Sequence, residues 1–144
     1  MINFGTVYFM NLQEEHFQRM KNGEKKYELR LFDDKRGRLS PGDYIVFQNL
    51  KNEEEQVACK IKSLHRYASF KELFEELHIV LDSVAPGISS DVALKKIREY
   101  YSEQEEKSDG VMAIGLELAN LEEVMKRYEY LEEQFERVFP DGMK

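Results

Sequence analysis

Alternating and periodic apolar positions divide the first part of the chain into three predicted elements. Residues 6–12 are rich in β-forming side chains and predict a strand, and residues 13–22 carry apolar side chains at helical spacing. Gly23 suits the left-handed backbone that ends many helices. Residues 26–31 then alternate charged with apolar side chains, which predicts a strand with a solvated charged face and a buried apolar face.

The next two strands are predicted to form a hairpin. Residues 44–48 and 57–64 are apolar or alternating, and the polar segment 49–54 joins them. Later in the chain, residues 111–118 predict a largely buried strand. The pattern therefore favours a run of neighbouring antiparallel strands.

Helices are predicted between the hairpin and the last strand, and again after that strand. Ser69 and Glu72 have the spacing of a capping box before an apolar stripe, and residues 91–101 predict a second short helix. Residues 102–109 are expected to form a charged loop. From Asn120 onward, apolar side chains recur at helical spacing.

This order of elements is typical of an α+β domain built on a small barrel or curled sheet. We expect about five to six mostly antiparallel strands, helices after the first strand and before the last, and a C-terminal helix. A length of 144 residues with 42% apolar content suffices for one domain. No signal segment or membrane-spanning run is predicted, so we expect a cytoplasmic protein, with Cys59 as a small buried side chain.

Charge changes this picture at one place. Between Lys21 and Arg38 the sequence places seven Lys or Arg residues against four Asp or Glu residues, although the chain has a formal net charge of −7. A local cationic surface on an acidic protein favours one bounded anionic ligand, because the remaining field repels a long polyanion. The histidines lie far apart and no phosphate-binding glycine loop occurs, so we expect neither a metal nor a cofactor.

Five separated motifs follow one another from about Thr6 to Leu118. They are Gly23-x-Lys25-x-x-Glu28-x-Arg30, Asp34-Lys35-Arg36, Gly42-Asp43-x-Ile45-x-Phe47, Tyr67-x-Ser69-Phe70, and Tyr100-Tyr101-Ser102 leading to Gly110-Val111. In these motifs the chain resembles the ASCH domain family, a branch of the PUA-like β-barrel superfamily. The resemblance implies an ASCH domain over residues 1–119, with residues 120–144 as a helical extension packed on it.

The resemblance also implies a cleft beside the barrel in which Lys25, Glu28 and Arg30 face RNA or a nucleotide-like molecule. Arg30 offers a planar fork to a phosphate or a guanine edge, and Glu28 can accept from an exocyclic amine or hold Arg30 in place. Further candidate ligand-binding residues are Lys26, Lys35 and Arg36, which would add charge, and Tyr67 and Tyr101, which would stack on a base. Phe70 could stack as well, but core packing is its better interpretation.

The position of Lys25 requires a turn. Lys25 and Glu28 are three residues apart, so in a regular strand their side chains would point to opposite faces. We therefore predict that residues 23–25 form a turn that brings Lys25 to the same cleft as Glu28 and Arg30.

A purely structural interpretation competes with a ligand site. Lys26, Glu28 and Arg30 would then form the solvated face of a strand, with charge pairs worth up to about 1 kcal/mol each. The acidic run Glu103–Glu106 would be a solvated loop, or it would border the cleft and repel long nucleic acid.

An enzymatic alternative follows from relatives that hydrolyse the amide of an acylated cytidine or cleave RNA. In such amidohydrolases the motif lysine acts with a threonine three residues later and a further glutamate, whereas this chain has Glu28 at the threonine position. Lys25 and Glu28 would then carry the acid and base steps. Candidates for the second acid are Glu72, Glu75 and Glu76. Because the nucleophile is missing, a binding domain is favoured over a hydrolase.

A third alternative is a protein-interaction module. The predicted C-terminal helix has an apolar stripe with Tyr128, Phe135 and Phe139, and such a stripe more often packs on its own domain than on a partner. The same stripe could instead pair two copies of the chain in a homodimer.

Overall fold

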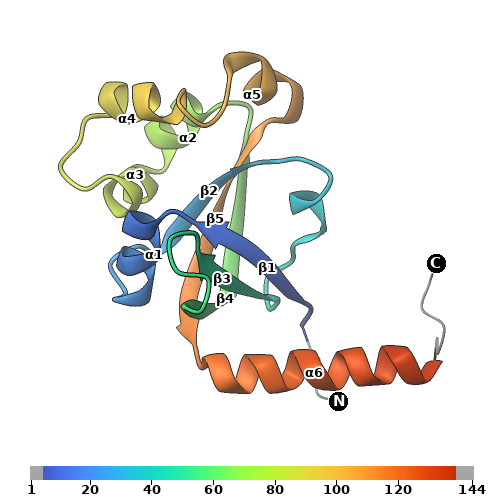
Figure 1. Cartoon of the computed structure of the whole chain (residues 1–144). Helices are drawn as coiled ribbons and strands as arrows, with labels where there is room; N and C mark the ends of the chain where they lie inside the picture. The colour runs from blue at the N-terminus through green and yellow to red at the C-terminus, as the bar shows by residue number, and fades with distance from the viewer. Residues whose placement is uncertain (1–4, 139–144) are drawn as a thin grey trace.

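The computed structural model describes residues 5–138, with side chains up to residue 134, and shows a five-stranded curled sheet with helices at both ends (Figure 1). The strands are β1 (Val7–Leu12), β2 (Tyr27–Leu31), β3 (Tyr44–Asn49), β4 (Gln56–Tyr67) and β5 (Val111–Ala119). The helices are α1 (Glu14–Lys21), α2 (Phe70–Glu76), α3 (His78–Val84), α4 (Ser90–Ile97), α5 (Glu103–Asp109) and α6 (Leu121–Val138), with a 3-10 helix at Arg36–Arg38. The predicted α+β class is confirmed.

The sheet order is β1-β3-β4-β5-β2, and its pairings are mostly antiparallel, as predicted. The pairs β3–β4, β4–β5 and β5–β2 are antiparallel, but β1 and β3 run parallel. The chain passes through α1 and β2 before it reaches β3, which gives the long connection that a parallel pair requires. Strand β2 consequently pairs with β5 at the far edge and not with its neighbours in sequence.

Buried apolar side chains form three clusters. The first packs α1 against the sheet and includes Phe17 and Ile114. The second packs α2, α3 and α4 against the other end of the sheet and includes Phe70. The third lies between α6 and strands β1, β3 and β4. Full burial of a side chain such as Phe17 or Phe70 stabilises the fold by about 1.5–3 kcal/mol. These two side chains therefore stabilise the packing of the first and second clusters.

Strand β2 divides its side chains between two faces as predicted, but its charged face is not solvated. In the pairing with β5, Glu28 lies opposite Ile114 and Arg30 lies opposite Met112. Directly opposite residues share a face of the sheet, so Glu28 and Arg30 lie on the face of the first cluster. Glu28 is only 5% exposed. The predicted solvated face is wrong at Glu28 because this face of the sheet packs against α1.

The helices between β4 and β5 correct the prediction in three places. Helix α3 lies outside the predicted elements, and α4 ends at Ile97, earlier than expected. Residues 103–109 form helix α5 and not a loop, because Ser102 and Glu105 form a capping box at its start. The predicted cap of α2 is present, since the Ser69 side chain accepts from the backbone N–H of Glu72.

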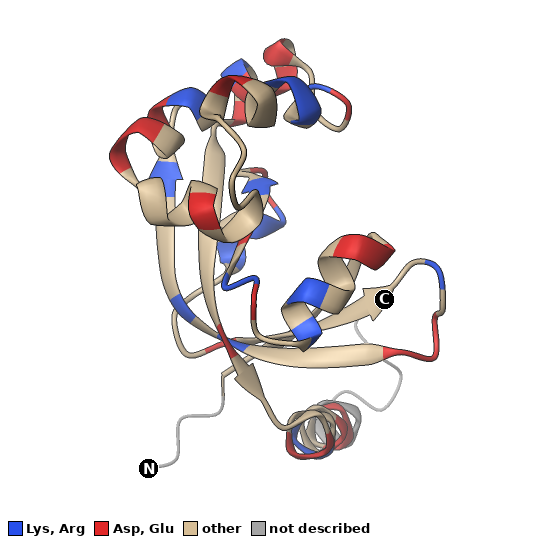
Figure 2. Cartoon of the chain, turned by 90° about the vertical axis from the view of Figure 1, so that its left-hand side faces the viewer, with Lys and Arg blue, Asp and Glu red and all other residues tan. Residues whose placement is uncertain are grey.

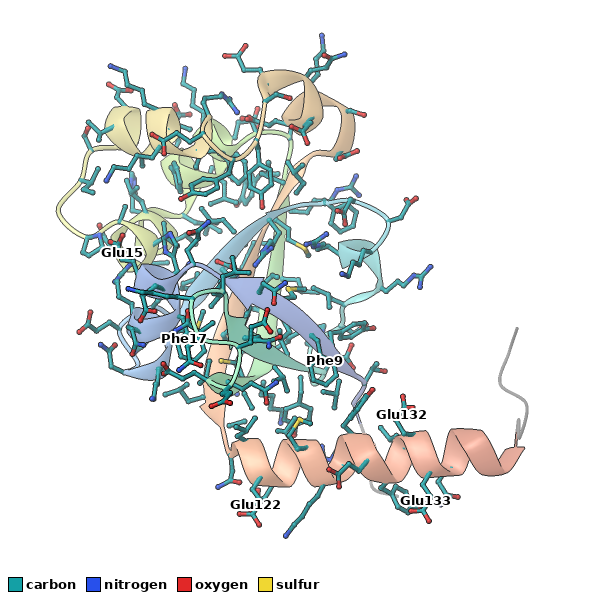
Figure 3. All side chains as sticks on the ribbon, viewed as in Figure 1. Phe9, Glu15, Phe17, Glu122, Glu132 and Glu133 are labelled. Atoms are coloured by element: carbon teal, nitrogen blue, oxygen red, sulfur yellow. The ribbon has the colours of Figure 1, made fainter. Side chains whose placement is uncertain are left out.

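Helix α6 lies across the end of the sheet that is remote from α2 to α5 (Figure 1). Val124 is buried against strands β1, β3 and β4. Phe9 of β1 points toward α6 (Figure 3) and meets Tyr128 edge to face, with ring centroids 4.9 Å apart. The side chains of Phe135 and Phe139 lie outside the described residues. A boundary between domain and extension after residue 119 stays a prediction.

The outer face of α6 is polar. Glu122 and Glu133 point away from the sheet (Figure 3), and charged segments gather on the helices while the strands are largely uncharged (Figure 2). Within residues 5–138, no helix combines the length and the apolar content that crossing a membrane requires. The cytoplasmic location stays a prediction.

Candidate functional site

A cleft of about 730 Å³ opens beside β2, and its walls come from α1, the helices α2 and α4, and the loop that follows α3. Lys25, Glu28 and Arg30 line one side of this cleft. Phe74, Tyr100 and apolar side chains of the helices line the other. The cleft therefore joins a charged wall on the sheet to an aromatic and apolar wall on the helices.

The charged wall is a buried triad centred on Glu28. Lys25 Nζ donates to Glu28 Oε1 at 2.8 Å. Arg30 donates to Glu28 Oε2 through Nε at 3.1 Å and through Nη2 at 2.8 Å. Arg30 Nη2 also donates to the backbone carbonyl of Asn11 at 2.8 Å, which ties β2 to the end of β1.

Glu28 has no acceptor position left for a ligand. Besides Lys25 and Arg30, the backbone N–H of Leu29 donates to Glu28 Oε1 at 3.3 Å. A carboxylate offers about four lone-pair sites, and these contacts use them all. Of the two roles considered for Glu28, the geometry therefore supports holding Arg30 in place and not accepting from an exocyclic amine.

Burial and ion pairing act on the pKa of Glu28 in opposite directions. Burial alone would raise this pKa, but the charges of Lys25 and Arg30 outweigh burial and lower it to about 2. For Arg30, burial alone would lower the pKa, whereas the Glu28 carboxylate raises it. Glu28 and Arg30 are therefore both ionised at neutral pH.

A turn brings Lys25 to this side of the sheet, as predicted. Gly23 has a φ of 84°, in the left-handed region, and the backbone N–H groups of Glu24 and Lys25 both donate to the Arg19 carbonyl. The regular strand begins only at Tyr27. Lys25 therefore precedes the alternation of the strand, and its amine meets Glu28.

Arg19 of α1 holds the end of α3 beside the cleft. Its Nη1 atom donates to the Val84 carbonyl at 3.0 Å, and its Nη2 atom donates to the Ser83 carbonyl. The backbone N–H of Lys26 donates to Ser83 Oγ at 2.8 Å. A cation at the C-terminal carbonyls of a helix is favourably placed, so these bonds fix the helical wall relative to the sheet.

His16 of α1 also lines the cleft, although the sequence pattern assigns it no role. Its Nδ1 atom lies 3.3 Å from Lys25 Nζ. An ammonium group only donates, so Nδ1 accepts and the neutral imidazole carries its proton on Nε2. Burial and then the charge of Lys25 lower the pKa of His16. No local spacing signals this contact, because it joins a helix to the turn after it.

Tyr101 lies beside Arg30 at the aromatic wall. Its phenol forms a hydrogen bond with Arg30, and burial raises the pKa of Tyr101. The Tyr101 ring stacks on Phe70 with centroids 5.9 Å apart, and Phe70 is fully buried in the core. One face of Tyr101 is thus covered, which leaves its other face for a ligand.

Comparison with known proteins establishes the family. The sequence pattern of the ASCH domain matches residues 10–120. The solved structure of the hypothetical protein PH0355 is 38% identical in sequence with a TM-score of 0.69, and the match covers 79% of this chain and 100% of that one. The chain belongs to the ASCH domain family.

Two further solved structures are similar to this ASCH domain. Protein PF0455 from Pyrococcus furiosus is 33% identical with a TM-score of 0.60, over 80% of this chain and 99% of that one. The ASCH protein from Zymomonas mobilis is 12% identical with a TM-score of 0.52, over 81% of this chain and 75% of that one, which shows the shared fold alone. A comparison with curated proteins finds no significant match.

The ASCH domain brings only part of the predicted set of ligand-binding residues to the cleft. Lys25, Glu28, Arg30 and Tyr101 line it, whereas the exposed Lys26 lines only a separate hollow, which Lys25 also borders. The separation follows from the turn, because consecutive lysines that straddle the start of a strand point in different directions.

Three other predicted residues lie outside the described lining of the cleft. Lys35 is exposed, and Arg36 forms an ion pair with Asp33 at 2.8 Å. Tyr67 packs among the apolar side chains under α2. Proximity to Arg30 in the sequence does not decide whether a side chain of the following loop reaches the cleft. Ligand roles for these residues stay predictions.

The acidic residues singled out in the sequence also lie away from the cleft. The candidates for a second acid are exposed on α2: Glu72, Glu75 and Glu76. Glu106 is buried, accepts from the backbone N–H of Phe70 at 3.2 Å and pairs with Arg98. The run Glu103–Glu106 is therefore neither a solvated loop nor a wall of the cleft but part of a helix that supports Phe70.

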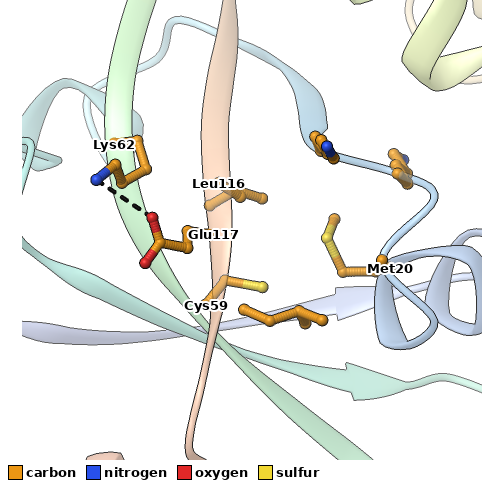
Figure 4. A pocket seen from close by; sticks show the side chains of 9 residues that line it. Met20, Cys59, Lys62, Leu116 and Glu117 are labelled. Atoms are coloured by element: carbon orange, nitrogen blue, oxygen red, sulfur yellow. Dashed lines mark ion pairs between the residues drawn. The ribbon is translucent and has the colours of Figure 1, made fainter.

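A second hollow of about 400 Å³ lies beside residues 23–26 (Figure 4). Met20 and Leu116 form its apolar wall, and Lys62 pairs with Glu117 across 3.2 Å at its edge. Cys59 is fully buried at this place, and burial raises the pKa of its thiol to about 12. Cys59 is thus a small buried side chain, as predicted.

The charged wall of the cleft offers hydrogen-bond donors to a ligand. In the described part of the chain, no group of three or more His, Cys, Asp or Glu side chains is placed to hold a metal ion. Lys25 retains one N–H beyond those directed at Glu28 and His16, and Arg30 retains the N–H groups of Nη1, one of which the Tyr101 phenol shares. A neutral His16 adds the N–H of Nε2.

Proposed function

We propose that this ASCH domain binds a nucleotide or a short single-stranded RNA element in its cleft. The observation that carries the proposal is the buried triad of Lys25, Glu28 and Arg30, whose carboxylate is saturated and whose remaining donors belong to side chains that line the cleft. Such donors suit a group that only accepts hydrogen bonds, such as a phosphate oxygen or a base carbonyl. The association of ASCH domains with RNA supports the same class of ligand.

The size and lining of the cleft support a bounded ligand. A volume of about 730 Å³ lies within the usual range of small-molecule sites, about 300–1,000 Å³. Tyr100 is 55% exposed and offers a ring face to an unpaired base, beside the free face of Tyr101. The net charge of −7 opposes binding of a long polyanion.

Two neighbouring lysines provide the test of this proposal. Lys25→Ala and Arg30→Ala should each weaken the binding of nucleotides and short RNA about tenfold, because each removes a charged donor in the cleft. Lys26→Ala removes the same charge outside the cleft and should change affinity less than about twofold at moderate salt. Isothermal titration calorimetry with a panel of nucleotides and oligonucleotides measures the affinities, and circular dichroism checks that each variant is folded.

Equal effects of Lys25→Ala and Lys26→Ala would contradict the proposal, because they would indicate diffuse attraction to surface charge. Affinity should also fall as salt rises, since phosphate binding releases counterions. An affinity that changes neither with salt concentration nor on substitution of Lys25 or Arg30 would indicate a ligand site outside the cleft.

The alternative of a hydrolase draws less support from the geometry. Glu28 stands where the nucleophile is expected, and a carboxylate with a pKa of about 2 and four donors does not exchange protons near neutral pH. Release of cytidine from an acylated cytidine, or of fragments from RNA, that disappears in Lys25→Ala would replace the binding proposal by an enzymatic one.

A further inference from the structure

The charges that line the cleft sum to +1 when His16 is neutral. The cationic members are Arg19, Lys25, Arg30 and Lys96, and the anionic members are Glu15, Glu28 and Glu99. An internal phosphodiester carries one negative charge and balances this lining without any proton. A terminal phosphate carries a charge close to −2 above its second pKa of about 6, so it leaves one negative charge unbalanced.

We propose that the cleft recognises the terminal phosphate of a nucleotide or short RNA, and that His16 takes up a proton when this phosphate binds. The inference rests on the proposed function and narrows its ligand to a phosphate monoester. It also makes His16 a residue that distinguishes a terminal phosphate from an internal one.

The contact between His16 and Lys25 provides the means for this proton uptake. Without ligand, Lys25 Nζ directs one N–H to His16 Nδ1, and the two nitrogens are 3.3 Å apart. A phosphate oxygen bound beside them accepts that N–H instead and leaves Nδ1 open. Nδ1 then takes a proton from solvent, and the resulting imidazolium and Lys25 both donate to the phosphate.

The charges around His16 favour this change only when a dianion is present. Glu15 and Arg19 flank His16 on α1 with opposite signs, and Lys96 of α4 and Glu99 just after α4 line the cleft with opposite signs. Glu28 is already paired with Lys25 and Arg30. In the free protein, burial and the charge of Lys25 lower the pKa of His16, so it is neutral near neutral pH. A bound dianion would counteract the charge of Lys25 and so raise the pKa of His16 again.

Titration calorimetry in two buffers of different ionisation enthalpy tests the inference. At about pH 7.5, nucleoside monophosphates should bind with net uptake of a proton, whereas nucleosides and dinucleoside monophosphates, which carry only a phosphodiester, should bind without it. His16→Gln should abolish the uptake and weaken the monophosphates about tenfold, with little change for the other two classes. His78→Gln, which removes an exposed histidine away from the cleft, is the matched control and should behave as the wild type.

Nuclear magnetic resonance gives a second measurement that does not depend on affinity. The chain has three histidines, so the imidazole signals can be assigned with single variants. The His16 signal should move to its protonated position when a monophosphate binds. Monophosphate binding with no proton uptake and a neutral His16 would overturn this inference and leave the proposed function intact. Failure of all three ligand classes to bind would overturn both.

Discussion

Glu28 is charged inside the protein because two cations accompany it. An isolated buried carboxylate would be protonated, but Lys25 at 2.8 Å and Arg30 at 2.8 Å hold the ionised form. Such a buried group contributes less to net stability than its contacts suggest, because desolvation offsets much of the attraction. Its larger consequence is that Arg30 and Lys25 are fixed in position before any ligand arrives.

Removal of the charge at Glu28 should destabilise the protein. Glu28→Gln leaves Lys25 and Arg30 buried without a counter-charge, which we expect to lower the free energy of unfolding by about 3 kcal/mol. Urea unfolding at neutral pH measures this change. Glu117→Gln is the matched control, because Glu117 pairs with Lys62 at a position where both side chains are more than half exposed, and it should change stability by less than about 0.5 kcal/mol.

Acid should remove the same contribution from the wild type. The pKa of Glu28 is lowered from 4.5 to about 2, so its ionised form stabilises the fold fully above pH 4.5, and this stabilisation is lost as pH falls through about 2. The loss should amount to about 3 kcal/mol across this window. Unfolding curves for the wild type and Glu28→Gln should converge as pH falls, and a constant difference between them would contradict the ion-pair account.

The turn between α1 and β2 decides which residues of the motif meet. Because of this turn, Lys25 does not follow the alternation of side chains that β2 imposes on Glu28 and Arg30. The turn depends on Gly23, whose backbone is in the left-handed region. The other elements follow similarly local rules: Ser69 begins α2 and Ser102 begins α5 through their side chains. The parallel partner of β1 is different, because it depends on how the whole connection through α1 and β2 folds back.

Substitution of Gly23 should disturb the turn. Gly23→Ala places a side chain at a φ of 84°, which we expect to cost about 1 kcal/mol of stability, although the new methyl group has space, with Leu118 Cδ1 at 3.9 Å. Nucleotide affinity should also fall, because the turn places Lys25. Gly37→Ala is the control, since Gly37 lies outside the left-handed region and its new methyl group would meet Phe32 Cζ at 3.8 Å. Thermal unfolding and calorimetry compare the two variants, and equal effects would contradict a special role for the turn.

Helices α2 to α5 and helix α6 lie at opposite ends of the sheet (Figure 1). The cleft forms where α1 to α4 approach the inward face of β2, and α6 covers the far ends of β1, β3 and β4. This arrangement leaves the cleft open while α6 buries apolar surface of the sheet. A homodimer through α6 stays a prediction, because the described contacts of α6 are with its own sheet.

A substitution that removes packing beneath α6 should lower stability without changing the oligomeric state. Val124→Ala removes buried methyl groups beneath α6 and should lower the free energy of unfolding by about 2 kcal/mol, with no change in sedimentation mass. Glu133→Ala, on the exposed face of the same helix, should leave both unchanged. A fall in mass on Val124→Ala would show instead that this stripe joins two copies of the chain.

Local spacing was sufficient to predict the strands, most helix starts, the alternating faces of β2 and the turn that carries Lys25. These features depend on near neighbours in the chain, whose geometry is set by strand alternation, helix periodicity and glycine conformation. The ASCH motifs were recognisable for the same reason, because they are short runs at regular separations. Helix α5 was missed although Ser102 and Glu105 carry its capping signal, because the high charge of the segment favoured a loop.

Packing in three dimensions determined the rest. Which face of β2 is solvated depends on what packs against it, and Glu28 and Arg30 lie opposite the buried Ile114 and Met112 of β5. His16 joins the site only because α1 packs beside the turn, while Lys35 and Arg36 lie outside the described lining of the cleft. The saturation of Glu28 likewise depends on distances between side chains. Contacts of this kind have no signature in local spacing, and they decide which of the motif's charges remain available to a ligand.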